Sequence, residues 1–147
     1  MIFAESLSGS INLSKSTMLK DAMLECTIDP GWITLTLNTL TRDHRNLQLV
    51  AIDASTVLRT IHSAIDDVDA HSVNLGDIIG QDRFRKWLEL DLLLAQLRES
   101  HSISLEIPYV VDYAMDDDDA KVLLKRLLPE VVGKGRAELI RSELDMW

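Results

Sequence analysis

Two clusters of acidic residues are the first candidates for chemistry in this sequence. Asp66, Asp67, Asp69 and His71 combine carboxylates with an imidazole, the side chains that bind divalent metals or serve as acids and bases. A run of four aspartates follows at residues 116–119. Calcium loops need carboxylates at alternate positions, a glycine turn and a distal glutamate, which this run lacks. We therefore interpret the run as the acidic first turn of a helix, and the first cluster as a solvated loop.

The other reactive residue types lack the spacing that their chemistry requires. No two of the four histidines follow a zinc-binding pattern, and we expect His44 and His101 to satisfy carbonyl groups at helix ends. Cys26 lies 28 residues before Ala54, which predicts a small buried position rather than a nucleophile. We expect no catalytic residue, no metal and no cofactor. The alternative is a small α/β enzyme with an acidic site around Asp66-His71.

Composition narrows the classes of function. The 147 residues fit one domain, 1–147, in which residues 1–17 form a polar, loose lead-in. A net charge of −9 argues against binding to nucleic acid or to an anionic membrane surface. The single cysteine, the absence of a secretory signal and the absence of a long apolar run predict an intracellular protein without a membrane span.

A recurring apolar pattern predicts the strands that would position these residues. Apolar residues at i, i+3 and i+5 occur twice, 28 residues apart, and the last two positions recur farther along: Leu19, Ala22 and Leu24; Leu47, Val50 and Ile52; Leu105 and Ile107. Strand, crossover and strand at this period are typical of a leucine-rich-repeat solenoid. Such arrays usually bind other proteins.

The segments between these strands are predicted to form helices and loops. Residues 32–41 fit either a strand or a helix, and Asp29-Pro30 at the start favours the helix. Pro108 places the strand over residues 103–111 at a sheet edge or near a strand end. The other predicted elements are helices over 54–66, 82–100 and 116–132, a loop over 66–80, and a strand or short helix over 137–144.

Two segments resemble fungal F-box proteins with leucine-rich-repeat-like domains. Thr39–Gln48 resembles a helix that ends in T-x-x-H-R-N-L and runs into a strand, and Trp87–Ile103 resembles that family's W-L-D-L-D-x-L-L-V-Q-x-W-E-S-x-S-I helix. The resemblance covers residues 30–140 and implies the substrate-binding repeat part of such a protein. Residues 1–28 carry no F-box motif, so the adaptor-binding half and its link to a ubiquitin ligase are not implied.

These observations together predict an α/β fold: a short leucine-rich-repeat-like array with a mostly parallel, curved sheet and helices on its outer face. The residues between and after the apolar positions would face the open side of the sheet: Met23, Glu25, Ala51, Asp53 and Glu106. This acidic surface with apolar patches predicts a non-catalytic protein-interaction module that binds a basic or amphipathic protein segment. The lead-in before Leu19 is a poor cap, so the exposed sheet edge also predicts self-association.

Overall fold

A single parallel sheet forms the centre of the protein. A computed structural model describes residues 2–5, 12–26, 28–64, 70–110 and 116–142, without side-chain detail for 2–5 and 142. The sheet has five strands in the order β1-β2-β3-β4-β5. The strands are β1 (Ile2–Glu5), β2 (Asp21–Glu25), β3 (Leu49–Asp53), β4 (Ser104–Val110) and β5 (Glu138–Ser142). The helices are α1 (Gly31–Leu37), α2 (Ser55–Ala64), α3 (Leu75–Ile79), α4 (Gln81–His101) and α5 (Asp117–Leu127).

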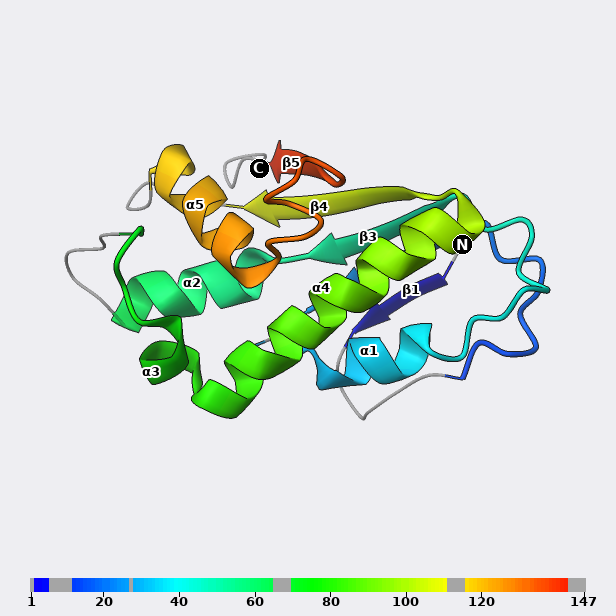
Figure 1. The fold of residues 1–147 in the computed structure, drawn as a ribbon, viewed down its shortest axis with the longest axis horizontal. Coiled ribbons are helices and arrows are strands. Elements are labelled where there is room, and N and C mark those ends of the chain that lie inside the picture. Colours follow the sequence, from blue (N-terminus) through cyan, green and yellow to red (C-terminus); the bar gives the residue numbers. More distant parts are fainter. Residues whose placement is uncertain (1, 6–11, 27, 65–69, 111–115, 143–147) are drawn as a thin grey trace, which may run out of the picture.

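The helices cover one face of this sheet. Each neighbouring pair of strands is parallel and the spatial order follows the sequence. Each successive strand joins the sheet on the same side of the previous strand. Because connections between parallel strands are right-handed, all of them then cross the same face of the sheet. Figure 1 shows this arrangement, with α4 running obliquely across the strands. The predicted α/β class and parallel sheet are confirmed.

The 28-residue spacing corresponds to the register of neighbouring strands. Ala22 pairs with Val50 and Leu24 pairs with Ile52 across β2 and β3, and Val50 pairs with Leu105 across β3 and β4. All of these side chains are buried under the helices. The apolar pattern therefore predicted both the pairing of the strands and the face that forms the core.

Several elements differ from the prediction or settle a question that it left open. β1 lies within the expected lead-in and pairs with β2, so the predicted open edge of β2 is covered and the outer strands are β1 and β5. The predicted loop contains α3, which Asn74 caps by accepting from the Asp77 N–H at 3.2 Å. Residues 31–37 form a helix, and residues 138–142 form a strand.

The prediction for Pro108 was correct in one of its two alternatives: the residue lies near the end of β4, which ends at Val110, but not in an edge strand. β4 lies between β3 and β5, so Pro108 belongs to an interior strand. The register between β3 and β4 ends at Ala51 and Glu106. Pro108 has no N–H to continue this ladder, although its carbonyl oxygen still accepts from the Ala54 N–H at 3.0 Å. The sheet therefore tolerates the proline at the point where regular pairing of β3 with β4 stops.

A buried carboxylate fixes the segment between α5 and β5. Asp91 of α4 is only 1% exposed and accepts from the backbone N–H groups of Glu130 and Val131, at 2.8 and 2.9 Å. Burial raises the pKa of this carboxyl, and the two N–H donors act in the opposite direction. α5 ends at Leu127, just before Pro129, and Asp91 then holds the turns that lead into β5.

Candidate functional site

The five residues predicted to face the open side lie on adjoining strands. Met23, Ala51 and Glu106 form one row across β2, β3 and β4, and Glu25 and Asp53 begin the next row toward the carboxyl ends of the strands. Side chains alternate between the two faces of a strand, so these residues point away from the helices. The structure thus brings together the residues that the repeat pattern selected.

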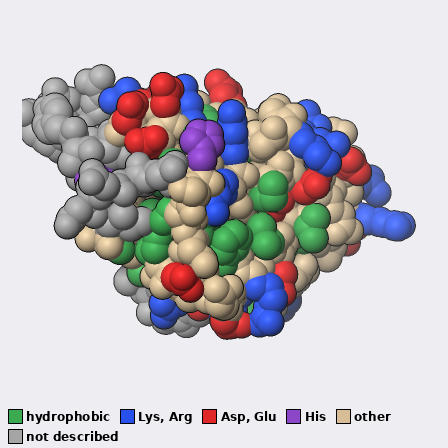
Figure 2. Space-filling model, turned by 60° about the vertical axis from the view of Figure 1, so that its left-hand side comes forward, with side chains coloured by type: hydrophobic (Ala, Val, Ile, Leu, Met, Phe, Trp, Pro, Cys, Tyr) green, Lys and Arg blue, Asp and Glu red, His purple; other side chains and the backbone are tan. Residues whose placement is uncertain are grey.

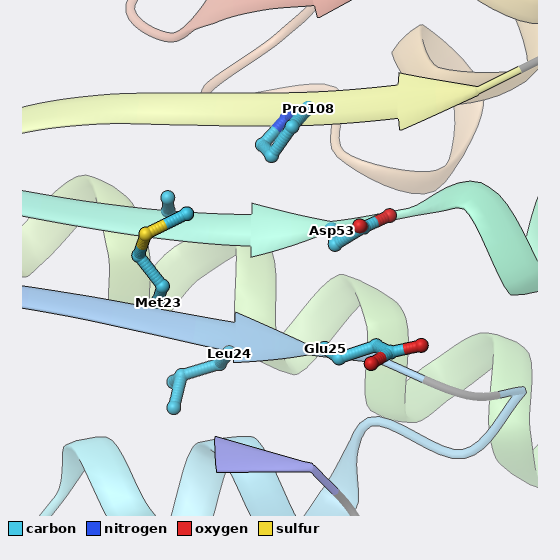
Figure 3. Close-up of a pocket in the computed structure, with 6 residues that line it drawn as sticks. Met23, Leu24, Glu25, Asp53 and Pro108 are labelled. Atoms are coloured by element: carbon cyan, nitrogen blue, oxygen red, sulfur yellow. The ribbon is translucent and has the colours of Figure 1, made fainter. Parts of the chain in front are cut away.

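Four of these residues line a hollow at the carboxyl ends of β2 and β3. Its volume is about 90 Å³, and its lining consists of Met23, Leu24, Glu25, Ala51, Asp53 and Pro108. In Figure 3, Met23 and Pro108 incline toward β3 from either side, while the side chains of Glu25 and Asp53 extend in the same direction beyond the strand ends. Glu106 is on the same face but outside the lining of the hollow.

The sequence predicted an exposed surface at this site and not a hollow. Ala51 was expected to be exposed, but it is only 2% exposed because its short side chain lies between the longer side chains of Met23 and Glu106 in the same row. It therefore forms part of the lining of a hollow rather than an outer surface. Pro108 is the functional candidate that the prediction missed, although proline within a predicted strand was the available signal.

The open face of the sheet is uniformly acidic. Among the described side chains that β2, β3, β4 and β5 direct to this face, carboxylates are the only charged groups: Asp21, Glu25, Asp53, Glu106 and Glu138. The end of the molecule that carries α2, α3 and α5 is different. Figure 2, which turns the end with α2, α3 and α5 forward, shows basic and acidic side chains interspersed around apolar patches.

Asp53 has a structural role as well as a place in the hollow. Its Oδ1 accepts from the Ser55 N–H at 2.9 Å, at the start of α2. Ser55 Oγ in turn accepts from the Val110 N–H at 2.8 Å, which links α2 to β4. A carboxylate offers about four acceptor positions, so one backbone hydrogen bond leaves capacity for a ligand.

A larger groove lies on the helix side. It encloses about 260 Å³ between residues 37–42 and the second half of α4, from Leu93 to His101. No carboxylate is among the described residues that line it, and His101 Nε2 already donates to the Thr41 carbonyl at 3.1 Å. Among these described residues, no carboxylate is paired with His101 as an acid–base partner.

His44 and His101 make structural hydrogen bonds, and Cys26 is buried in the core. The Thr41 N–H donates to Nδ1 of buried His44 at 2.9 Å, so its Nε2 carries the proton and donates to the Leu13 carbonyl at 2.8 Å. His101 is the last residue of α4, as predicted, whereas His44 lies in a loop. Both bind loop carbonyls, those of Thr41 and Leu13, rather than the terminal carbonyls of a helix. Burial, and then the charges of Asp29 and Asp53, raise the pKa of the Cys26 thiol, so it is not an activated nucleophile.

The aspartate run is a helix start, as predicted. Asp116 Oδ1 accepts from the Asp118 N–H at 3.0 Å, and Asp117 accepts from the Tyr109 hydroxyl at 2.8 Å. Of the other acidic cluster, residues 66, 67 and 69 lie outside the described residues. Within the part of the chain that the structure describes, no three His, Cys, Asp or Glu side chains are grouped so as to hold a metal ion.

Comparison with known proteins gives no relative from which a role could be taken. No family model, no curated protein and no solved structure matches this chain. None of the helices in the described ranges is long and apolar enough to cross a membrane. Inference about function therefore depends on the geometry and charge of the open face.

Proposed function

We propose that this chain is a non-catalytic protein-interaction module whose open sheet face binds a basic, amphipathic segment of another protein. The observation that carries the proposal is the acidic face, on which Met23, Pro108 and Ile140 lie among the carboxylates. Like-charged groups on one face attract partners of opposite charge and exclude partners of the same charge.

The architecture supports the same proposal. Sequential parallel strands with helices on one face leave the other face available, as in leucine-rich-repeat arrays that bind proteins on a concave sheet. We propose that the chain is a short array of this kind, similar to the substrate-binding repeat part of fungal F-box proteins. Among the described residues, α2, α3 and α4 lie between β3 and β4, whereas α1 lies between β2 and β3, so the array is irregular.

A matched pair of charge-reversal variants tests the proposal. The face variant combines Glu25→Lys, Asp53→Lys and Glu106→Lys. The control combines Asp82→Lys, Glu89→Lys and Glu99→Lys, which makes the same change in net charge on exposed positions of α4. Proteins captured from a cell extract by the wild-type chain are identified by mass spectrometry, and one of them is purified for direct titration.

The expected result is a dissociation constant at least about tenfold weaker for the face variant and nearly unchanged for the control. Binding should also weaken as salt is added, because exposed charges are screened. Equal losses in both variants would mean non-specific attraction to an acidic protein. No loss in the face variant would overturn the proposal.

Self-association remains a second, smaller proposal. Among the described strands, β1 and β5 each have a neighbour on one side alone, and the outer side of such a strand is a template for another strand. Light scattering over a wide concentration range should show a rising mean mass. A constant monomer mass would contradict it.

A further inference from the structure

We propose that the hollow at the ends of β2 and β3 is a socket for one lysine or arginine side chain of the bound partner. This inference rests on the proposed function, since it assumes that a protein segment lies across the open face. It adds the chemical group that anchors this segment and the position at which it enters.

The shape of the hollow selects a single aliphatic chain. At about 90 Å³ the hollow is well below the roughly 300–1,000 Å³ of typical small-molecule and cofactor pockets. Its sides include the thioether of Met23, the methyl group of Ala51 and the ring of Pro108. Lysine and arginine place their methylene stems on apolar surface of this kind and keep their charged ends near polar groups.

The charge of the hollow selects a cation at the end of that stem. Glu25 and Asp53 pair in register on neighbouring strands, which lie about 4.8 Å apart in a sheet. Their side chains extend together beyond the strand ends (Figure 3). A carboxylate has about four acceptor positions, so Glu25 and Asp53 can each accept from a cation in addition to the contacts that they make within the protein. An ammonium or guanidinium group has enough N–H donors to serve both.

Blocked amino acids are direct probes of this socket. The full chain, labelled with ¹³C at its methionine methyl groups and with ¹⁵N, is titrated with Nα-acetyl-lysine amide, Nα-acetyl-arginine amide and Nα-acetyl-norleucine amide. Norleucine has an aliphatic chain similar to the stem of lysine but no charge. We expect saturable shifts of the Met23 methyl group and the Ala51 and Asp53 amides with lysine or arginine, with dissociation constants of about 1–10 mM. The ratio of the two constants tells which cation the socket prefers.

Three variants separate the socket from the general charge of the face. Glu25→Gln with Asp53→Asn should weaken binding of the cationic probes about tenfold. Asp21→Asn with Glu138→Gln removes the same charge from the same face outside the hollow, and should change binding less than about twofold. Ala51→Leu fills the hollow without changing charge, and should abolish the shifts. Dispersed amide spectra confirm folding, and Ala51→Val replaces the leucine variant if that protein does not fold.

The outcomes distinguish this inference from the proposal on which it rests. Equal binding of norleucine and lysine, or unchanged binding to Ala51→Leu, would overturn the socket. If a purified partner no longer binds the charge-reversed face variant but binds the Ala51→Leu variant with wild-type affinity, the socket is wrong and the proposed function stands. If the partner binds the charge-reversed face variant with wild-type affinity, both the socket and the proposed function are wrong.

Discussion

The two faces of the sheet are made by the same strands but have opposite chemistry. On the covered face, Ala22, Val50 and Leu105 continue one buried apolar row beneath the helices. On the open face, the adjacent row of Met23, Ala51 and Glu106 continues into Glu138 of β5, so it includes two carboxylates. One residue along a strand thus separates the two environments.

This difference separates stability from recognition. Burial of apolar side chains is the dominant favourable term in folding, and the covered face supplies it. Carboxylates on the open face add no comparable burial, and their mutual repulsion slightly opposes folding. Substitutions on the covered face should therefore change the free energy of unfolding. Substitutions on the open face should mainly change binding, with the exception of Asp53, which also accepts a hydrogen bond at the start of α2.

The largest expected effect is the loss of a buried side chain from the covered face. Ile52→Ala should lower the free energy of unfolding by about 2–5 kcal/mol, because Ile52 is fully buried and its truncation leaves a cavity. Met23→Ala on the open face should cost less than about 1 kcal/mol. Urea denaturation measures both, and similar costs would mean that the open face is also a core surface.

The next effect compares a buried carboxylate with an exposed one. Asp91→Asn should cost about 1–3 kcal/mol, because an amide has one oxygen to accept from two backbone N–H groups. Glu106→Gln on the open face is the matched change of carboxylate to amide. Its denaturation midpoint should stay close to that of the wild type, and an equal loss in both variants would contradict the distinction.

A pH-dependent effect follows from the pair of Tyr109 and Asp117. The Tyr109 hydroxyl, together with Lys121 and Arg141, lowers the pKa of Asp117. A carboxyl whose pKa is lower in the folded state stabilises the fold above its ordinary pKa, and this contribution is lost as the pH falls through the lowered value. Tyr109→Phe should therefore cost about 1 kcal/mol at pH 7 and less near pH 3. Denaturation at the two pH values tests this, and a constant cost would contradict it.

The smallest effect concerns repulsion on the open face. Glu138→Gln should change the free energy of unfolding by less than about 0.5 kcal/mol and in the stabilising direction at low salt. The difference from wild type should shrink on addition of about 0.5 M NaCl, which screens exposed charges. A destabilising change that salt does not alter would show that Glu138 makes a specific structural contact.

Features that depend on a local residue pattern were predicted from the sequence, whereas features that depend on contacts between distant segments were not. Ala22 and Val50 could be aligned because strand register follows the repeated positions of buried residues, and Asp116 could be assigned as a cap because capping depends on adjacent backbone. β1 could not be recognised, since a four-residue segment is defined by its pairing with β2 rather than by its own pattern.

The candidate site shows the same limit. Alternation along β2 and β3 predicted which residues face outward, because side-chain direction is a local property. The burial of Ala51 depends on the lengths of Met23 and Glu106, which lie on other strands. The participation of Pro108 depends on the point where β3 and β4 cease to pair, which only the assembled sheet defines.

Pro108 links the shape of the hollow to the pairing of the strands. Its ring borders the hollow, and its missing N–H coincides with the end of regular pairing between β3 and β4. Any other amino acid at this position would supply a backbone N–H for pairing with β3 and would change the shape of the open face. The apolar side chains on the covered face would stay the same. A substitution at this one position would therefore change both the surface that a bound segment contacts and the extent of strand pairing.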